Sequence, residues 1–305
     1  MFRMSPLFLV LSLSVAAADS SIRIKSPKPT QLEVQRGDKG PTLVTSLITE
    51  THGRPYLHPL RSPDGKGVLT QFSPGHHKHQ TGLYWGPTRI NGRDYFHNYN
   101  QKFWANTKIT PQPSLGGSPL SWSSSSDLLG ADAKPILRDT QKWSMIDHGT
   151  WYTLDLEWTA HAQVDVTIGK YAYGGLFLRM PWKRGIPAEC LNSEGLKNQA
   201  GEGQAAKWVD LAMRIEGMDE MAHIAMIDHP KNAGYPTLWR IDGQFGIGPA
   251  FTRKGDVLIP KGSKTTYRYR LLVYQGEFNS KLVGEEARSF GLLFQGGTAP
   301  SPAKP

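Results

Sequence analysis

The sequence predicts an all-β protein, a large antiparallel β-sandwich with one short C-terminal helix. Three observations predict this fold. Short stretches of alternating apolar and polar residues recur along the chain, and this period is typical of half-buried strands. Glycine and proline, at 32 and 22 of 305 residues, are frequent enough to favour many turns over long helices. No repeat with a period of about 20–50 residues is present, which disfavours a β-propeller.

The first 18 residues have the layout of a secretory signal peptide. Arg3 supplies the basic start, an apolar run extends from Leu7 to Val15, and the small residues Ala16 and Ala18 precede the expected cleavage site. The apolar run is shorter than the roughly 20 residues that a membrane-spanning helix needs. We therefore expect an exported protein, periplasmic or extracellular, with no membrane insertion.

The rest of the chain is expected to form one β-sandwich domain over residues 19–295, followed by a disordered low-complexity tail at 296–305. Residues 19–30 should form a leading tail or a first edge strand. The alternation over 31–50 predicts a hairpin that turns around 37–41.

Residues 110–135 are rich in serine, glycine and proline, so we expect a long surface excursion there. Strand patterns follow at 152–159, 174–182, 207–215, 221–228 and 265–276. The segment 235–248 should continue the strand that precedes it. Apolar residues at helical spacing predict a helix over 280–293.

Composition argues against several classes of protein. Cys190 is the single cysteine, so neither an internal disulfide nor a thiolate metal cluster can form. The formal net charge is +9, but lysine and arginine are spread along the chain without long blocks, so we expect no nucleic acid partner. The absence of glycine-rich phosphate-binding motifs and of GxSxG argues against nucleotide enzymes and serine hydrolases.

The segment 54–86 holds four of the ten histidines, and its prolines and glycines predict an ordered loop. His76, His77 and His79 form the pattern H-H-x-H. In an extended segment His77 and His79 would share a face. Two such imidazoles can act as acid and base near neutral pH, or bind a divalent metal with a third ligand from elsewhere. A plain hydrogen-bonded loop is the alternative.

Other polar residues stand at strand positions where a chemical role and a structural role are both open. Asp228 and His229 end a strand, where the carboxylate can orient the imidazole for acid–base catalysis or only cap the turn. Arg179 stands among apolar residues, so it should meet either a carboxylate or a substrate oxygen. Asp155 and Glu157 share a strand face, where they could flank a glycosidic bond or simply face solvent.

Five motifs carry a family resemblance. They are RPYLHPLRSPDG, PGHHKHQTGLYWG, GGLFLRMP, KWVDL and IDHPKNAGYPTLWRI, which begin at residues 54, 74, 174, 207 and 227. Together they resemble the bacterial family labelled methane oxygenase PmoA, over about residues 30–278. A membrane methane monooxygenase crosses the bilayer several times, and this sequence has no stretch of spanning length. Methane oxidation is therefore not expected.

The resemblance implies an exported β-sandwich similar to the galactose mutarotase-like fold, in which histidines and a carboxylate on a concave face act on a sugar. The positions that match the motifs are Arg54, His58, His76, His77, His79, Arg179, Trp208, Asp210, Asp228, His229, Asn232 and Trp239.

We therefore expect a carbohydrate-active protein, most simply an enzyme that acts on a sugar or glycoside in a concave pocket by epimerisation, hydrolysis or elimination. The catalytic candidates are His77, His79, His229 and Asp228. The expected substrate-binding residues are Arg54, His58, His76, Trp85, Arg179, Trp208, Asp210, Asn232 and Trp239.

Two alternatives stay open. One is a non-catalytic carbohydrate-binding module, in which stacking tryptophans carry the affinity. The other is a metal-dependent enzyme with a divalent metal at the 76–79 segment; otherwise no cofactor is expected. In each case the expected partner is a small-molecule or oligosaccharide substrate.

Overall fold

The computed structural model describes residues 22–48, 53–75, 77–97, 103–112 and 119–294. The expected signal peptide at 1–18, the expected tail at 296–305 and His76 lie outside the described residues. No helix in the described ranges is long and apolar enough to cross a membrane.

Two eight-stranded antiparallel sheets make up most of the fold. The first has the order β1-β2-β3-β4-β5-β11-β16-β15. Its strands are β1 (Ile22–Lys28), β2 (Gln31–Arg36), β3 (Thr42–Leu47), β4 (Tyr56–Leu60), β5 (Leu83–Gly86), β11 (Gly175–Arg179), β15 (Trp239–Ile241) and β16 (Gly246–Pro249).

The second sheet has the order β12-β13-β14-β18-β9-β8-β7-β6. Its strands are β6 (Trp104–Pro111), β7 (Leu120–Leu129), β8 (Pro135–Asp147), β9 (Tyr152–Ala162), β12 (Ala188–Asn192), β13 (Trp208–Arg214), β14 (Met221–Asp228) and β18 (Lys264–Gln275). The remaining elements are β10 (Val166–Ile168), β17 (Val257–Ile259), the short helix η1 (Asn198–Gly201) and α1 (Ser280–Leu292).

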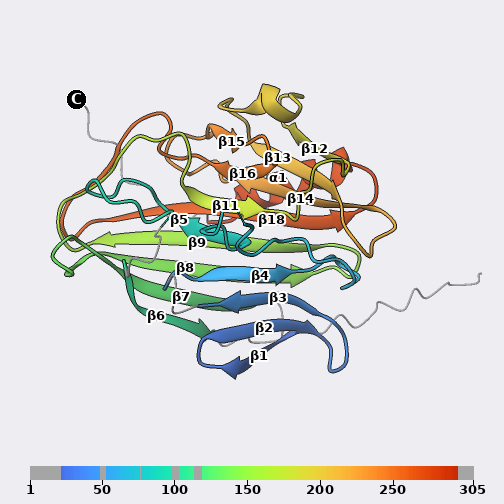
Figure 1. Cartoon of the computed structure of the whole chain (residues 1–305), viewed down its shortest axis with the longest axis horizontal. Coiled ribbons are helices and arrows are strands. Elements are labelled where there is room, and N and C mark those ends of the chain that lie inside the picture. Colours follow the sequence, from blue (N-terminus) through green and yellow to red (C-terminus); the bar gives the residue numbers. More distant parts are fainter. Residues whose placement is uncertain (1–21, 49–52, 76, 98–102, 113–118, 295–305) are drawn as a thin grey trace, which may run out of the picture.

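The two sheets pack face to face around an aromatic core. On β9 the alternating residues Tyr152, Leu154, Leu156 and Trp158 are buried, as the period of a half-buried strand predicts. Trp158 stacks on Trp85 of β5, with ring centroids 4.2 Å apart, so the rings join the two layers. Figure 1 shows the labelled strands of both sheets running in about the same direction, as in an aligned sandwich. The predicted all-β sandwich is confirmed.

Several predicted elements are also confirmed. The first strand, β1, lies at the edge of its sheet. The hairpin around 37–41 is the antiparallel pair β2 and β3. The predicted C-terminal helix is α1, whose start is capped by the Asn279 side chain.

Two predictions are wrong. Much of 110–135 is not a surface excursion, because β7 runs through it and pairs with both β6 and β8. Leu120 and Trp122 point into the core, so a strand period is present behind the polar composition. The segment 235–248 does not continue β14. After β14 the chain crosses to the first sheet and forms β15 and β16 there.

Helix α1 covers the outer face of the second sheet. Val283 is buried there in a cluster with residues of β14 and β18. Arg270 of β18 links sheet and helix, because it pairs with both Asp155 and Glu286 at 2.7 Å. Glu157 pairs with the next outward arginine of β18. These two carboxylates of β9 therefore bind arginines and do not flank an open cleft.

Candidate functional site

An aromatic cluster on the outer face of the first sheet supports the histidine segment. Tyr84 of β5 and Phe177 of β11 are paired neighbours in the sheet, and they point away from the core because the residues that flank them point into it. Tyr56 and Phe96 pack with them in one buried cluster. The loops after β4 and β5 lie against this cluster. The sheet therefore fixes where the polar side chains of these loops lie.

Arg54 ties the two loops together. Its guanidinium donates to the backbone oxygen of Phe96 and, over 2.5 Å, to that of His79. The guanidinium also lies 3.8 Å from the centre of the Tyr84 ring. Burial lowers the pKa of Arg54 to about 10, which leaves the side chain charged at neutral pH. Arg54 is fully enclosed and so acts as a positioning residue.

Three imidazoles form a row above the aromatic cluster. The rings of His77 and His79 have centroids 5.7 Å apart, and those of His79 and His97 are 4.3 Å apart. Nδ1 of His97 lies 2.5 Å from Oδ2 of Asp94. The other oxygen of Asp94 accepts two backbone N–H groups. A carboxylate that accepts from Nδ1 orients the ring and leaves Nε2 as its basic nitrogen.

The middle of this row is neutral and Asp94 is ionised at neutral pH. Burial lowers the pKa of His79 to about 3, and electrostatic interactions with His97, Arg54 and His77 add to the effect. Burial alone would raise the pKa of Asp94, but hydrogen bonds from the His97 ring and backbone bring it below its usual value. His79 is therefore an uncharged hydrogen-bonding group beside a carboxylate-bound imidazole.

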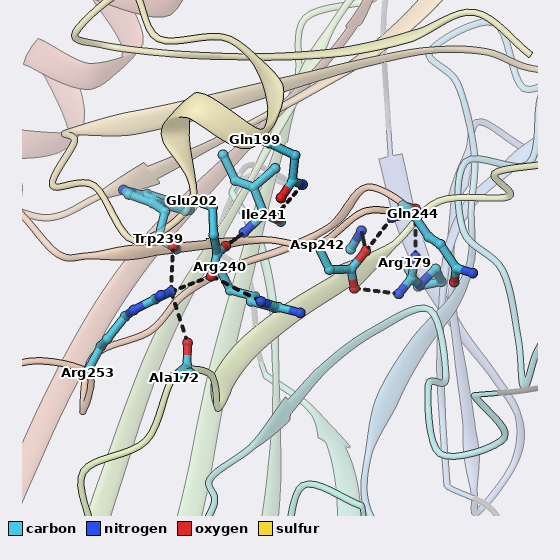
Figure 2. A network of polar contacts seen from close by, with 11 residues as sticks. Ala172, Arg179, Gln199, Glu202, Trp239, Arg240, Ile241, Asp242, Gln244 and Arg253 are labelled. Atoms are coloured by element: carbon cyan, nitrogen blue, oxygen red, sulfur yellow. Dashed lines mark hydrogen bonds and ion pairs between the residues drawn. The ribbon is translucent and has the colours of Figure 1, made fainter.

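Arg179 and Asp242 form another wall of the site. Arg179 donates to the Gln80 side chain over 2.5 Å, to the Gln244 backbone oxygen over 2.6 Å and to Oδ2 of Asp242 over 2.8 Å. Its side chain is 2% exposed and that of Asp242 is 14% exposed, so the carboxylate is the more accessible partner. Gly246 leaves room for this pair, because a Cβ there would lie 2.6 Å from Nη2 of Arg179. Figure 2 shows the pair next to Gln244.

Glu202 binds two further arginines near this pair (Figure 2). Its Oε1 accepts from Nη1 of Arg240 over 3.0 Å and from Nη1 of Arg253 over 2.7 Å. Its Oε2 accepts the backbone N–H of Ile241. The Arg240 guanidinium lies 5.7 Å from the centre of the Tyr173 ring. Burial raises the pKa of Tyr173, so its phenol stays protonated.

These side chains surround one open pocket of about 100 Å3. The lining residues are His77, His79, Gln80, Phe96, His97, Tyr173, Phe177, Arg240 and Asp242. One water needs about 10–15 Å3 of cavity volume measured in this way, so the open pocket has room for several polar groups of a ligand. Imidazoles, a carboxylate and a guanidinium beside aromatic rings suit a ligand that has hydroxyl groups and an apolar face.

The imidazoles and the carboxylate of the pocket are groups that can transfer protons. Asp242 is the one carboxylate among its described lining residues, whereas most glycoside hydrolases use a pair of carboxylates. Within the described ranges, no group of three or more His, Cys, Asp or Glu side chains is placed to hold a metal ion. The metal at 76–79 stays a prediction, because His76 is outside those ranges.

The structure brings part of the predicted site together. His77 and His79 line the pocket. Arg54 and Arg179 lie behind it and bind its lining residues. His58 lies on the same sheet, but its Nδ1 is 2.9 Å from a threonine hydroxyl and it does not line the pocket.

The predicted tryptophans do not present a face to this pocket. Trp85 is fully buried between the sheets, and Trp239 is fully buried with its Nε1 donating to the Ala206 backbone oxygen over 2.8 Å. Trp208 is half-buried on the second sheet and packs on Phe278, with ring centroids 6.0 Å apart. Trp85 and Trp239 are therefore not placed to stack on a sugar in this pocket.

Asp228 ends β14 of the second sheet, His229 and Asn232 follow it, and none of the three joins the histidine row. Asp228 accepts from Nδ2 of Asn232 over 2.7 Å and from a backbone N–H over 2.9 Å, and burial raises its pKa to about 7. His229 is buried against Phe290 of α1 and reaches the Leu293 backbone oxygen. These contacts fix a turn and the end of α1. The expected convergence of His229 with the histidine segment is not observed.

Asp210 belongs to a separate buried cluster on the second sheet. Its Oδ2 lies 2.8 Å from Nδ1 of His223, and its Oδ1 accepts from the Tyr274 hydroxyl over 2.9 Å. Nε2 of His223 is 3.0 Å from the Gly276 backbone oxygen. Each polar atom of the cluster therefore has a partner within the fold, and Asp210 does not reach the pocket.

Sequence reasoning missed five groups of the site: Asp94, His97, Tyr173, Arg240 and Asp242. One signal was available for the first two. An aspartate three residues before a histidine, in the aromatic stretch RDYFHNY, suits a carboxylate that orients an imidazole. Tyr173 comes from one distant segment and Arg240 and Asp242 from another, and the fold alone brings them to the histidines.

Solved structures of sugar-active enzymes show a distant likeness to this chain. The curated protein sequences give no match. A Klebsiella pneumoniae structure assigned as an aldose 1-epimerase is 10% identical, with 86% of this chain and 83% of that chain covered and a TM-score of 0.43. The α-galactosidase from Lactobacillus brevis is 8% identical, with 85% and 40% covered and a TM-score of 0.34. A galactose mutarotase related enzyme from Lactobacillus acidophilus is 6% identical, with 84% and 100% covered and a TM-score of 0.31. At these identities the likeness concerns the fold alone.

The sequence family is defined more directly. A family model described as a family of unknown function, DUF6807, matches residues 32–288. This range contains both sheets from β2 onward and every residue that lines the pocket. The label methane oxygenase PmoA stays a prediction. The chain belongs to the DUF6807 family of unknown function.

Proposed function

We propose that this protein is an exported enzyme that transfers protons on a single sugar unit, with interconversion of anomers as the reaction that fits best. The observation that carries the proposal is the Asp94–His97 pair at one end of a row of imidazoles in an open polar pocket. A carboxylate-oriented imidazole is a general base. The sugar assignment rests on the mixture of hydrogen-bonding groups and aromatic faces in the lining.

The reaction needs one base and one acid. The base removes the proton of the anomeric hydroxyl, the bond from C1 to the ring oxygen breaks, and the acid protonates that oxygen. Closure on the other face of the resulting aldehyde reverses both transfers, so atoms and electrons balance. We assign the base to Nε2 of His97 and the acid to His77 at the other end of the row. Neutral His79 lies between them, where it can hold a substrate hydroxyl.

The geometry favours this reaction over glycoside hydrolysis. Hydrolysis would require a second carboxylate beside Asp242, and the described lining offers none. Asp242 is also held by Arg179 through an ion pair, so this carboxylate is already engaged by the fold.

Polarimetry with freshly dissolved pure anomers tests the proposal. A panel of neutral and acidic hexoses is compared with wild-type protein, His97→Gln and the control His161→Gln, which removes a histidine from β9 of the other sheet. We expect faster equilibration of at least one sugar with wild type and His161→Gln, and a loss of about 100-fold or more in His97→Gln. Sugar binding without acceleration would contradict catalysis and support the carbohydrate-binding alternative.

Export has its own test. We propose cleavage after Ala18, because the start of the chain has the layout of a signal peptide. Expression of the full chain followed by N-terminal sequencing of the secreted or periplasmic fraction should give Asp19 as the first residue. Recovery of uncleaved protein in the cytoplasm would contradict this proposal and leave the enzymatic one unaffected.

A further inference from the structure

Positive charge exceeds negative charge along the Glu202 side of the pocket. Among the described residues, Arg179, Arg240 and Arg253 form ion pairs with two carboxylates, those of Glu202 and Asp242. Figure 2 shows Glu202 in contact with both Arg240 and Arg253, beside the separate Arg179–Asp242 pair. Both oxygens of Glu202 are occupied, since the second accepts a backbone N–H. The three arginines and two carboxylates therefore leave one guanidinium charge in excess.

The excess charge is available to a ligand at Arg240. The exposed fractions of the side chains are 2% for Arg179, 23% for Arg253 and 31% for Arg240. Of these three arginines, Arg240 is the one that lines the pocket. Nη1 of Arg240 donates to Glu202. Among the described residues, Nε and Nη2 of Arg240 meet no hydrogen-bond acceptor.

Arg240 is also held in a defined place. The ion pair to Glu202 fixes one edge of the guanidinium, and the Tyr173 ring lies 5.7 Å from it. A guanidinium held in this way loses little conformational freedom when it binds a further planar anion. Its fork of N–H donors matches the two oxygens of a carboxylate.

We propose that the pocket selects an acidic sugar, a uronic acid unit whose carboxylate binds the free edge of Arg240 while its ring lies over the aromatic lining. This inference rests on the proposed function and names its substrate class. A carboxylate matches the single excess charge, whereas a phosphate group carries about −1.5 to −2 charges at neutral pH. The small volume of the pocket favours a free uronic acid or a terminal unit over the interior of a glycan.

Isothermal titration calorimetry with D-galacturonate, D-glucuronate and the matching neutral hexoses tests the inference. With wild type we expect an acid to bind at least about tenfold more tightly than its neutral counterpart. Arg240→Gln should abolish this preference by weakening the acid alone. Arg240→Lys, which retains the charge near Glu202, should show an intermediate preference and guards against a folding defect in the first variant. The control Arg184→Gln removes an exposed arginine outside the pocket and should leave the preference unchanged.

The outcomes separate the two proposals. Equal binding of acidic and neutral sugars by wild type would overturn the inference and leave the proposed function standing. An unchanged preference in folded Arg240→Gln would overturn it as well. Binding of no hexose or uronic acid at all would overturn both.

Discussion

At the scale of single residues, Arg54 donates to the backbone oxygens of both His79 and Phe96 and so ties the loop after β4 to the loop after β5. Arg54→Met leaves these buried oxygens without a donor, and each such loss costs about 1–3 kcal/mol. We therefore expect the free energy of unfolding, measured by urea denaturation, to fall by about 2–6 kcal/mol. Exposed Arg184→Met is the control and should change it by less than about 0.5 kcal/mol. Similar small effects in both variants would contradict a positioning role for Arg54.

Asp94 is the residue that most directly tests the assigned base. Asp94→Asn keeps the shape of the side chain but removes the charge that orients and supports the His97 imidazole. We expect kcat for anomer interconversion to fall by about 100-fold or more, while Tm stays within a few degrees of wild type. The control Asp132→Asn removes an exposed carboxylate. A variant with wild-type kcat would show that His97 does not act through Asp94.

Residue types in the sequence pointed to part of this site and misled elsewhere. The local density of histidines was enough to indicate His77 and His79. The burial of Trp85 could not be predicted from the sequence, because a tryptophan in a strand gives the same sequence pattern whether its ring is buried or exposed. Asp228 beside His229 is adjacent in sequence, but the backbone turns there, and the two side chains take part in different structural contacts.

At the scale of elements, α1 is attached to the second sheet by a bridge of charges. Arg270 pairs with Asp155 and Glu286, and these side chains are 5%, 12% and 14% exposed. Arg270→Leu should therefore lower the free energy of unfolding by about 3–5 kcal/mol, because it leaves two enclosed carboxylates unpaired. Arg268→Leu, on the same strand, breaks a more exposed pair with Glu157 and should cost about 1 kcal/mol or less. Equal losses in urea denaturation would contradict this difference.

The sequence predicted strands well where apolar residues alternate with polar ones, and less well where composition hides the period. β7 was missed because serines occupy half of its ten positions, although Leu120 and Trp122 keep the alternation. The change of sheet after β14 could not be predicted at all. Which strands pair is decided by contacts between distant segments, and no local pattern specifies them.

At the scale of the whole molecule, the Asp139 carboxyl group in the core between the sheets links stability to pH. Asp139 is fully buried and accepts from the indole N–H of Trp158 and from Gln141. Burial raises the pKa of Asp139 to about 7. An unfolded aspartate loses its proton near pH 4, so between about pH 4 and 7 the folded chain holds a proton that the unfolded chain lacks. This group's contribution to stability is therefore present at low pH and is lost as the pH rises through that window.

Asp139→Asn removes this linkage. The free energy of unfolding of the variant, relative to wild type, should increase by at least about 1.4 kcal/mol between pH 4.5 and pH 8, the equivalent of one pKa unit. Urea denaturation at the two pH values measures it. The exposed Asp132→Asn variant should show no such pH-dependent difference. A constant difference for Asp139→Asn would mean that the carboxyl group is ionised in the folded protein across the range.

The central claim is that the histidine pocket on the first sheet is where a sugar binds. NMR spectra of the histidine ring signals, recorded on protein labelled with 15N and 13C at histidine, test it most directly during titration with galactose and galacturonate. We predict that the signals of His77, His79 and His97 shift together with one binding constant, while those of His223 and His229 on the second sheet stay in place. Shifts confined to His229, or no shift of the three pocket histidines with either sugar, would contradict the claim.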